Sequence, residues 1–150
     1  MTKVVIVGGG YAGFYTAFKL EKLLRRGEAE VTVIDPLPYM TYQPFLPEVA
    51  AGSIEARHAI VPLRRHLPKT RVVTARVAGV DHSKKKVTVT PEGGADFTLD
   101  YDHIVITAGA VSRTFPIPGV ADSAIGMKTI EEAISVRDRV IDNLHIAADM

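Results

Sequence analysis

The first third of the chain alternates between two spacings of apolar residues. Residues 3–7 (KVVIV) form a short, β-branched apolar run, which is typical of a strand buried on both faces of a parallel sheet. Residues 11–26 change to the spacing of a helix, and Gly27 supplies a stop signal. Residues 31–34 (VTVI) form a second buried run. We therefore predict a strand, a helix and a second, parallel strand over this stretch.

Residues 36–53 break both spacings. Four prolines fall within twelve positions there, which we take to exclude a regular helix or a central strand. Aromatic and apolar residues separate the prolines, so we expect an ordered loop that packs against another part of the chain. Beyond it, Pro62 is placed to open a short helix that runs to His66, and Pro68 is placed to end it.

Strand patterns return at residue 71. Residues 71–81 have strand character, and residues 85–101 contain two alternating runs joined by a Pro-Glu-Gly-Gly turn, which predicts a hairpin. Residues 103–107 (HIVIT) predict another buried strand. Thr129 and Glu132 form a capping box before a final helix, which we interpret as a core-packing helix. Its regularly spaced apolar residues are Ala133, Val136, Val140, Leu144 and Ala147.

These elements predict an α/β protein with a Rossmann-like, doubly wound parallel sheet and an inserted β-hairpin or meander. A length of 150 residues favours one domain, and 47% hydrophobic with 23% charged residues is ordinary for a globular chain. The formal net charge of +1 gives no general attraction to nucleic acid, so we expect no such partner. The five histidines lack the spacing of a metal site, and we expect no metal.

Two features missing from the sequence narrow the class of protein further. The chain has no cysteine, which excludes disulfides, thiolate zinc sites and dithiol redox chemistry within it. It shows neither a signal-peptide pattern nor an apolar run of the roughly 20 residues that cross a bilayer. The absence of cysteine fits any compartment, and we expect a cytoplasmic protein.

The turn after the first predicted strand matches the dinucleotide fingerprint Gly8-x-Gly10-x-x-Gly13. Gly8 would allow the tight turn, Gly10 would let the backbone approach a pyrophosphate, and Gly13 would let the helix pack closely. The following helix would direct its free N–H groups and positive dipole end at the phosphates. A glycine-rich turn kept for packing alone is the alternative, and the surrounding strand–helix–strand pattern favours the nucleotide site.

An acidic residue, Asp35, follows the second predicted strand, 22 residues beyond Gly13. A carboxylate there can accept hydrogen bonds from both hydroxyls of a nucleotide ribose. It would repel a 2′-phosphate, which disfavours NADP. A solvated strand end is the alternative for Asp35. The nucleotide interpretation leaves open whether the ligand is NAD or FAD, although the proline-rich loop and hairpin depart from a typical nicotinamide-binding half.

Through these features together, the chain resembles the flavoprotein pyridine-nucleotide oxidoreductases with two dinucleotide-binding domains. Within them it is most similar to the type II NADH dehydrogenases, the single-subunit NADH:quinone reductases. The resemblance covers essentially the whole chain, and the order of its segments is more specific than the glycine motif. The segments are VVIVGGGYAG (4–13), VIDP (33–36), YQPFLPEVAAG (42–52), RVAGVD (76–81), DYDHIVITAGA (100–110), PIPGV (116–120) and KTIEEAISVRDRV (128–140).

The resemblance implies FAD as the cofactor and assigns roles to particular residues. The glycine turn would line the FAD pyrophosphate, Asp35 would hold the adenosine ribose, and the backbone of Val77 would pair with the adenine edge. The loop that contains Gln43 would lie towards the isoalloxazine ring, and two residues after the last parallel strand would lie beside the FAD. The implied cofactor-binding residues are Gly8, Gly10, Tyr11, Ala12, Gly13, Asp35, Gln43, Val77, Ala108 and Gly109, and no catalytic residue is implied.

The resemblance also implies a reaction and its partners. A relay from NADH through FAD to a quinone needs no cysteine nucleophile, which fits a chain without cysteine. A ferredoxin- or rubredoxin-reductase-like enzyme and a non-catalytic nucleotide-binding module stay open as alternatives. Peripheral association of the longer enzyme with the cytoplasmic face of a membrane is compatible with the family, and the oligomeric state is left open.

The chain carries a single glycine fingerprint, whereas this family has two. We therefore expect residues 1–150 to be an amino-terminal FAD-binding segment, with the NADH-binding and C-terminal domains of a longer enzyme lying outside it. NADH and quinone would be partners of that longer enzyme, and this segment by itself is expected to be inactive.

Overall fold

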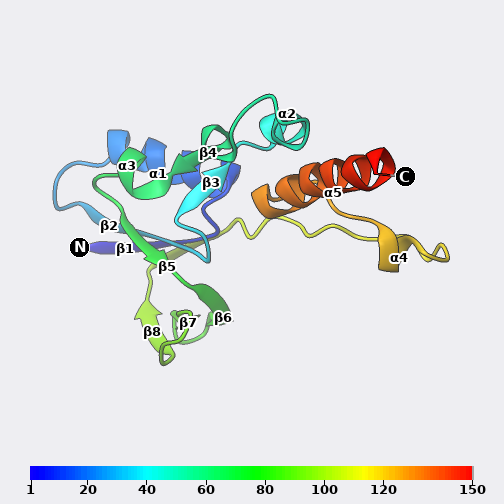
Figure 1. Cartoon of the computed structure of the whole chain (residues 1–150). Helices are drawn as coiled ribbons and strands as arrows, with labels where there is room; N and C mark the ends of the chain where they lie inside the picture. Colours follow the sequence, from blue (N-terminus) through cyan, green and yellow to red (C-terminus); the bar gives the residue numbers. More distant parts are fainter. Residues whose placement is uncertain (150) are drawn as a thin grey trace. The chain divides into compact units, whose positions relative to one another are not determined.

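The computed structural model describes residues 1–149, which form two compact units. The first unit combines Met1–Met40 with Val61–Gly109, and the second combines Thr41–Ile60 with the chain from Ala110 onward. Figure 1 labels their helices and strands in chain order. The glycine motif and Asp35 both belong to the first unit.

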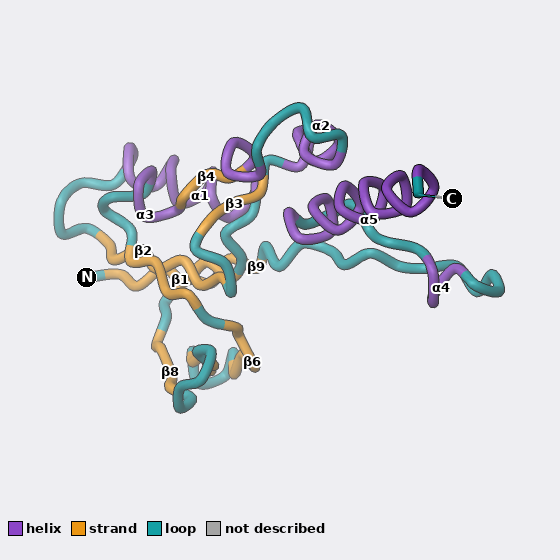
Figure 2. Tube along the Cα trace, viewed as in Figure 1, coloured by secondary structure: helices purple, strands orange, loops and turns teal. Residues whose placement is uncertain are grey.

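The first unit is built on a four-stranded parallel sheet with the strand order β5-β2-β1-β9. Figure 2 shows the strands, among them β1 and β2, in orange. In the register of this sheet, Val4 lies opposite Val31 on one side and His103 on the other. Strands β1 and β9 are therefore neighbours although about a hundred residues of chain separate them, which confirms the predicted parallel α/β sheet. The strands are β1 (Thr2–Val7), β2 (Ala29–Asp35), β5 (Arg71–Thr74) and β9 (His103–Ile106).

Side chains of β1 alternate between two hydrophobic cores, one on each face of the sheet. Ile6 is fully buried in the same cluster as Phe14 of helix α1 (Tyr11–Leu23). Its neighbours Val5 and Val7 belong to a second cluster with Val87 of a three-stranded meander. Because both faces are covered, the strands need apolar residues at consecutive positions, which is the run seen in the sequence. Figure 1 shows α1 on one side of the sheet and the meander on the other.

The meander contains the predicted hairpin. Strand β7 pairs antiparallel with β6 and with β8, in the order β6-β7-β8. Across the hairpin, the Lys86 Nζ lies 2.8 Å from the Asp100 Oδ1, and this ammonium holds the pKa of the Asp100 carboxyl below its ordinary value. The strands are β6 (Arg76–Asp81), β7 (Lys86–Thr90) and β8 (Phe97–Asp100).

The run predicted as strand over residues 71–81 divides between two sheets. Its first part, β5, is the edge of the parallel sheet, and its second part, β6, begins the meander. The break falls at Ala75, whose N–H donates to the carbonyl oxygen of Asp35 at 2.9 Å. This bond fixes the start of β6 beside the carboxyl end of β2.

Short elements connect the long ones. Strands β3 (Tyr39–Thr41) and β4 (Ile60–Pro62) pair into a two-stranded sheet. Helix α3 (Leu63–His66) follows directly, as the prolines predicted, with Pro62 as its N-cap residue. Leu63 is fully buried in the core on the α1 side of the sheet.

The exclusion of a helix between residues 36 and 53 is wrong at one place. A 3₁₀ turn, η1 (Gln43–Phe45), leads into helix α2 (Leu46–Ala50). Pro47 lies in the first turn of this helix, where a missing N–H costs no intrahelical hydrogen bond. Four prolines therefore shorten the helix to five residues without preventing it.

Helix α5 (Ile130–Ala148) is the longest element of the second unit. It begins with the predicted capping box, in which the Glu132 N–H donates to the Thr129 Oγ1 at 3.2 Å and the Thr129 N–H donates to Glu132 Oε2 at 3.0 Å. The unit also contains η2 (Ala56–Ala59) and α4 (Val120–Ser123). None of the helices in residues 1–149 has the length and apolar composition needed to cross a membrane.

Only the start of α5 is the core-packing helix that we expected. Ala133 is fully buried, and α5 packs against α2 and η2. Further along, however, Val140 and Leu144 are 54% and 64% exposed. The helical spacing of apolar residues was therefore a correct signal for the helix but a wrong one for burial along its whole length.

Candidate dinucleotide-binding site

The glycine motif forms the turn from β1 into α1, at the carboxyl end of the parallel sheet. Helix α1 begins at Tyr11 with Gly10 as its N-cap residue, and none of the side chains of residues 1–149 caps this helix end. Its first turn contains no acidic residue. The N–H groups of the first turn and the positive end of the helix dipole therefore face a position that suits an anion.

Gly8 makes the tight turn that the motif predicted. Its φ of 99° lies in the left-handed region that favours glycine, and its N–H donates to the carbonyl oxygen of Ile34 at 2.8 Å. A Cβ on Gly8 would overlap the carbonyl group of Thr107, the residue directly after β9. Two neighbouring strands therefore hold this turn, and only glycine fits between them.

The other two glycines of the motif face different surroundings. A Cβ on Gly13 would overlap the carbonyl oxygen of Gly8, so this glycine lets α1 pack directly on the turn. A Cβ on Gly10 would meet no atom within 4 Å. The space in front of Gly10 is thus open, which is the geometry that close approach of a ligand to the backbone requires.

The carboxylate of Asp35 reaches the glycine turn. Its Oδ2 accepts a hydrogen bond from the Gly9 N–H at 2.6 Å, and its Oδ1 accepts one from the Leu37 N–H at 2.7 Å. A Cβ on Gly9 would lie 2.7 Å from the Leu63 Cδ1 and 3.2 Å from the Asp35 Cβ, so this glycine also allows the close contact. Each carboxylate oxygen keeps further acceptor capacity for ribose hydroxyls.

Thr107 is a site residue that the sequence analysis missed. Its N–H donates to the carbonyl oxygen of Val7 at 2.8 Å, and its hydroxyl lies 2.8 Å from that oxygen and 3.0 Å from the Gly8 carbonyl oxygen. It therefore ties the end of β9 to the glycine turn. A threonine that ends an apolar run just before Ala-Gly was the available signal.

The remaining predicted residues divide between the two units. The backbone nitrogen of Ala108 lies next to Gly8, and Gly109 follows with a φ of 72°. Val77 lies in β6, two residues after the Ala75 N–H that bonds to β2. Gln43 begins η1 in the second unit, so its approach to the cofactor stays a prediction.

The residues present fit a dinucleotide with a diphosphate bridge. The turn offers an open glycine backbone and a helix N-terminus for the diphosphate, with a carboxylate at the end of the adjacent strand for a ribose. Within residues 1–149 no cluster of three or more histidine, aspartate or glutamate side chains could hold a metal ion. Fold and site together define an α/β dinucleotide-binding protein.

The chain belongs to the pyridine nucleotide-disulphide oxidoreductase family, whose model matches residues 2–146. It is 37% identical over 155 aligned positions to the external alternative NAD(P)H-ubiquinone oxidoreductase B2 of Arabidopsis thaliana mitochondria. It is also 36% identical over 138 positions to the type II NADH:quinone oxidoreductase of Staphylococcus aureus. The matches cover 97% and 91% of the chain but only 26% and 32% of those relatives.

A solved structure shows the same arrangement. NDH2 from Plasmodium falciparum, in a complex with NADH, superimposes with a TM-score of 0.87 at 25% identity. The match covers 98% of this chain and 30% of that one. The chain therefore spans between a quarter and a third of the length of its relatives.

Proposed function

We propose that this chain forms the FAD-binding part of a flavoprotein that passes electrons from NADH to a quinone. The observation that carries the proposal is the open backbone at Gly10, beside the carboxylate of Asp35, in a chain of this family. Relatives named as NADH:quinone and NAD(P)H-ubiquinone oxidoreductases support the choice of donor and acceptor. A quinone acceptor supports a peripheral place for the whole enzyme at a membrane, and we propose that this is the cytoplasmic face.

The chain's own residues would bind and orient the cofactor. The backbone of Gly10, Tyr11 and Ala12, at the start of α1, would hold the diphosphate. Asp35 would accept hydrogen bonds from the adenosine ribose, and the backbone of Val77 would contact the adenine edge. Bound FAD would accept hydride and pass its electrons onward. This chemistry belongs to the cofactor, so the protein need provide no nucleophile.

The proposal predicts that this chain alone does not catalyse the transfer of electrons from NADH to a quinone. Its sequence holds one dinucleotide fingerprint, and a direct relay needs one site for FAD and a second for NADH. Purified chain saturated with FAD is therefore expected to oxidise NADH no faster than free FAD does when a soluble quinone is added. Steady quinone reduction well above that background would contradict the two-site proposal and favour a complete activity within these residues.

Replacing Asp35 tests the ribose assignment. Asp35→Ala removes the charged carboxylate that would accept hydrogen bonds from the two ribose hydroxyls. FAD affinity is therefore expected to fall about tenfold to a hundredfold. The same change leaves the Gly9 and Leu37 N–H groups without their partner and should also lower stability by about 1–3 kcal/mol. Flavin fluorescence titration measures the first effect, and urea unfolding measures the second.

A matched control separates the two effects. Asp102 likewise accepts a backbone hydrogen bond, from the Lys3 N–H at 2.6 Å, but it lies at the opposite end of β1. Asp102→Ala is expected to lower stability while leaving FAD affinity unchanged. If both variants bind FAD as the wild type does, Asp35 does not hold the ribose; if both lose FAD equally, the effect is one of stability alone.

A further inference from the structure

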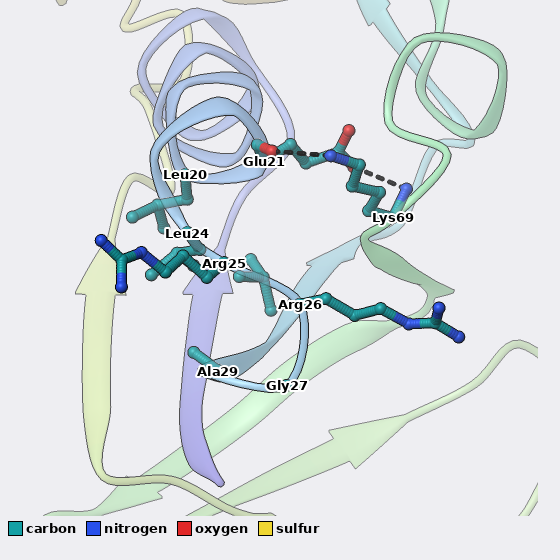
Figure 3. Close-up of a pocket in the computed structure, with 9 residues that line it drawn as sticks. Leu20, Glu21, Leu24, Arg25, Arg26, Gly27, Ala29 and Lys69 are labelled. Atoms are coloured by element: carbon teal, nitrogen blue, oxygen red, sulfur yellow. Dashed lines mark hydrogen bonds between the residues drawn. The ribbon is translucent and has the colours of Figure 1, made fainter.

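A cavity lies in the first unit, at the end of the sheet remote from the glycine turn (Figure 3). It is bounded by the last turn of α1, by the turn that follows and by the start of β2 at Ala29. The glycine turn, in contrast, adjoins the other end of β2 at Asp35. The cavity measures about 450 Å³, which is within the range of small-molecule sites.

The floor of this cavity is apolar. Leu20 lies in the last turns of α1 and Leu24 is the residue that caps its C-terminus, and both are only partly buried. Ala29 and Val31 supply the facing surface from β2. Val31 is buried in the core, whereas Leu20, Leu24 and Ala29 are partly exposed and leave apolar area that a ligand could cover.

The rim of the cavity is cationic. Arg25 and Arg26 follow the helix, and Figure 3 shows their side chains extending to opposite sides of the turn. Among residues 1–149, neither guanidinium lies within ion-pair distance of a carboxylate. Lys69 adds a third cation from the loop before β5.

One carboxylate, that of Glu21, is among the residues lining the cavity, and it is already engaged. Its Oε1 accepts hydrogen bonds from the Lys69 N–H at 2.9 Å and from the Thr70 hydroxyl at 2.7 Å. The Lys69 Nζ donates to the Glu21 carbonyl oxygen at 3.1 Å. Beside the lining, the Glu28 Oε2 accepts a hydrogen bond from the Arg25 N–H at 2.9 Å. Within the lining itself three cations face one carboxylate, so the lining carries a net positive charge.

Stabilisation of the C-terminus of α1 does not by itself explain why cations surround an apolar surface here. Cations after a helix C-terminus interact favourably with the helix dipole, and Lys69 meets that need at the Glu21 carbonyl. The interaction with the helix dipole does not explain why an open apolar surface lies beside the two arginines. A guanidinium, moreover, suits a carboxylate because its fork of N–H groups matches the two oxygens.

We propose that this cavity binds a small amphipathic carboxylate. Its aliphatic chain would lie on Leu20 and Leu24, and its carboxylate would interact at the rim with one guanidinium, that of Arg25 or that of Arg26. The site is separate from the proposed nucleotide site, because the two adjoin opposite ends of β2.

Calorimetric titration of the full chain with octanoate tests the proposal. Affinity is expected to rise about fourfold with each methylene from butanoate to octanoate, as the apolar floor is covered. Octylammonium, with the same chain length and opposite charge, is expected to bind at least about tenfold more weakly than octanoate. Equal binding of octylammonium, or binding of acetate as tight as that of octanoate, would overturn the proposal.

A pair of double variants locates the site. Arg25→Gln with Arg26→Gln is expected to weaken octanoate binding at least about tenfold. Arg64→Gln with Arg65→Gln makes the same change of charge on α3, outside the cavity, and should leave the affinity within about twofold of the wild type. Equal losses of octanoate affinity in both variants would show nonspecific charge attraction and overturn the site. The series from butanoate to octanoate tests the apolar part of the proposal without either variant.

Discussion

Gly13→Ala is expected to destabilise the chain strongly. The new Cβ would overlap the carbonyl oxygen of Gly8, which is backbone and is itself held between Ile34 and Thr107. Helix α1 would have to move away from the sheet, and Phe14 would lose part of its packing against Ile6. We expect a loss of about 3 kcal/mol or more in the free energy of unfolding, a large part of a typical domain's stability.

Urea unfolding followed by circular dichroism measures this loss. Gly79→Ala is the matched control, because a Cβ at Gly79 would meet no atom within 4 Å and the backbone there does not have a positive φ. That variant should unfold within about 1 kcal/mol of the wild type. A Gly13→Ala chain as stable as the Gly79→Ala chain would show that α1 does not depend on close contact with the turn.

Gly10→Ala is expected to separate binding from folding. The added Cβ would meet open space, and the φ of −70° at Gly10 is accessible to alanine. Alanine is a poorer N-cap than glycine, but it also restricts the unfolded chain, so stability should change by about 1 kcal/mol or less. On our proposal the same methyl group occupies the place where the diphosphate approaches the backbone, so FAD affinity should fall at least about tenfold.

The sequence predicted the strand, the glycine turn and the helix of the proposed nucleotide site because their signals are local. The apolar run before Gly8, the helical spacing after Gly13 and the carboxylate at the end of the next run each lie within one element. The parallel sheet then follows from the chemistry of strands buried on both faces. The structure confirms this α/β arrangement and brings Asp35 to the Gly9 N–H.

Other features depended on contacts between distant segments. Nothing in residues 71–81 marks the break at Ala75, because it arises from a hydrogen bond to Asp35 in another strand. The bonds from Thr107 to the glycine turn likewise join residues about a hundred positions apart. The spacing of α5 could not reveal that Leu144 is exposed, since a helical period indicates an apolar face but not what covers it.

The central claim is that the turn after β1 holds FAD through its backbone, and a flavin fluorescence titration of two proteins tests it most directly. The wild-type chain should bind FAD saturably, and Gly10→Ala should fold with the same circular dichroism spectrum yet bind FAD at least about tenfold more weakly. Equal FAD affinity in the two proteins, or no saturable FAD binding by the wild type, would contradict the account.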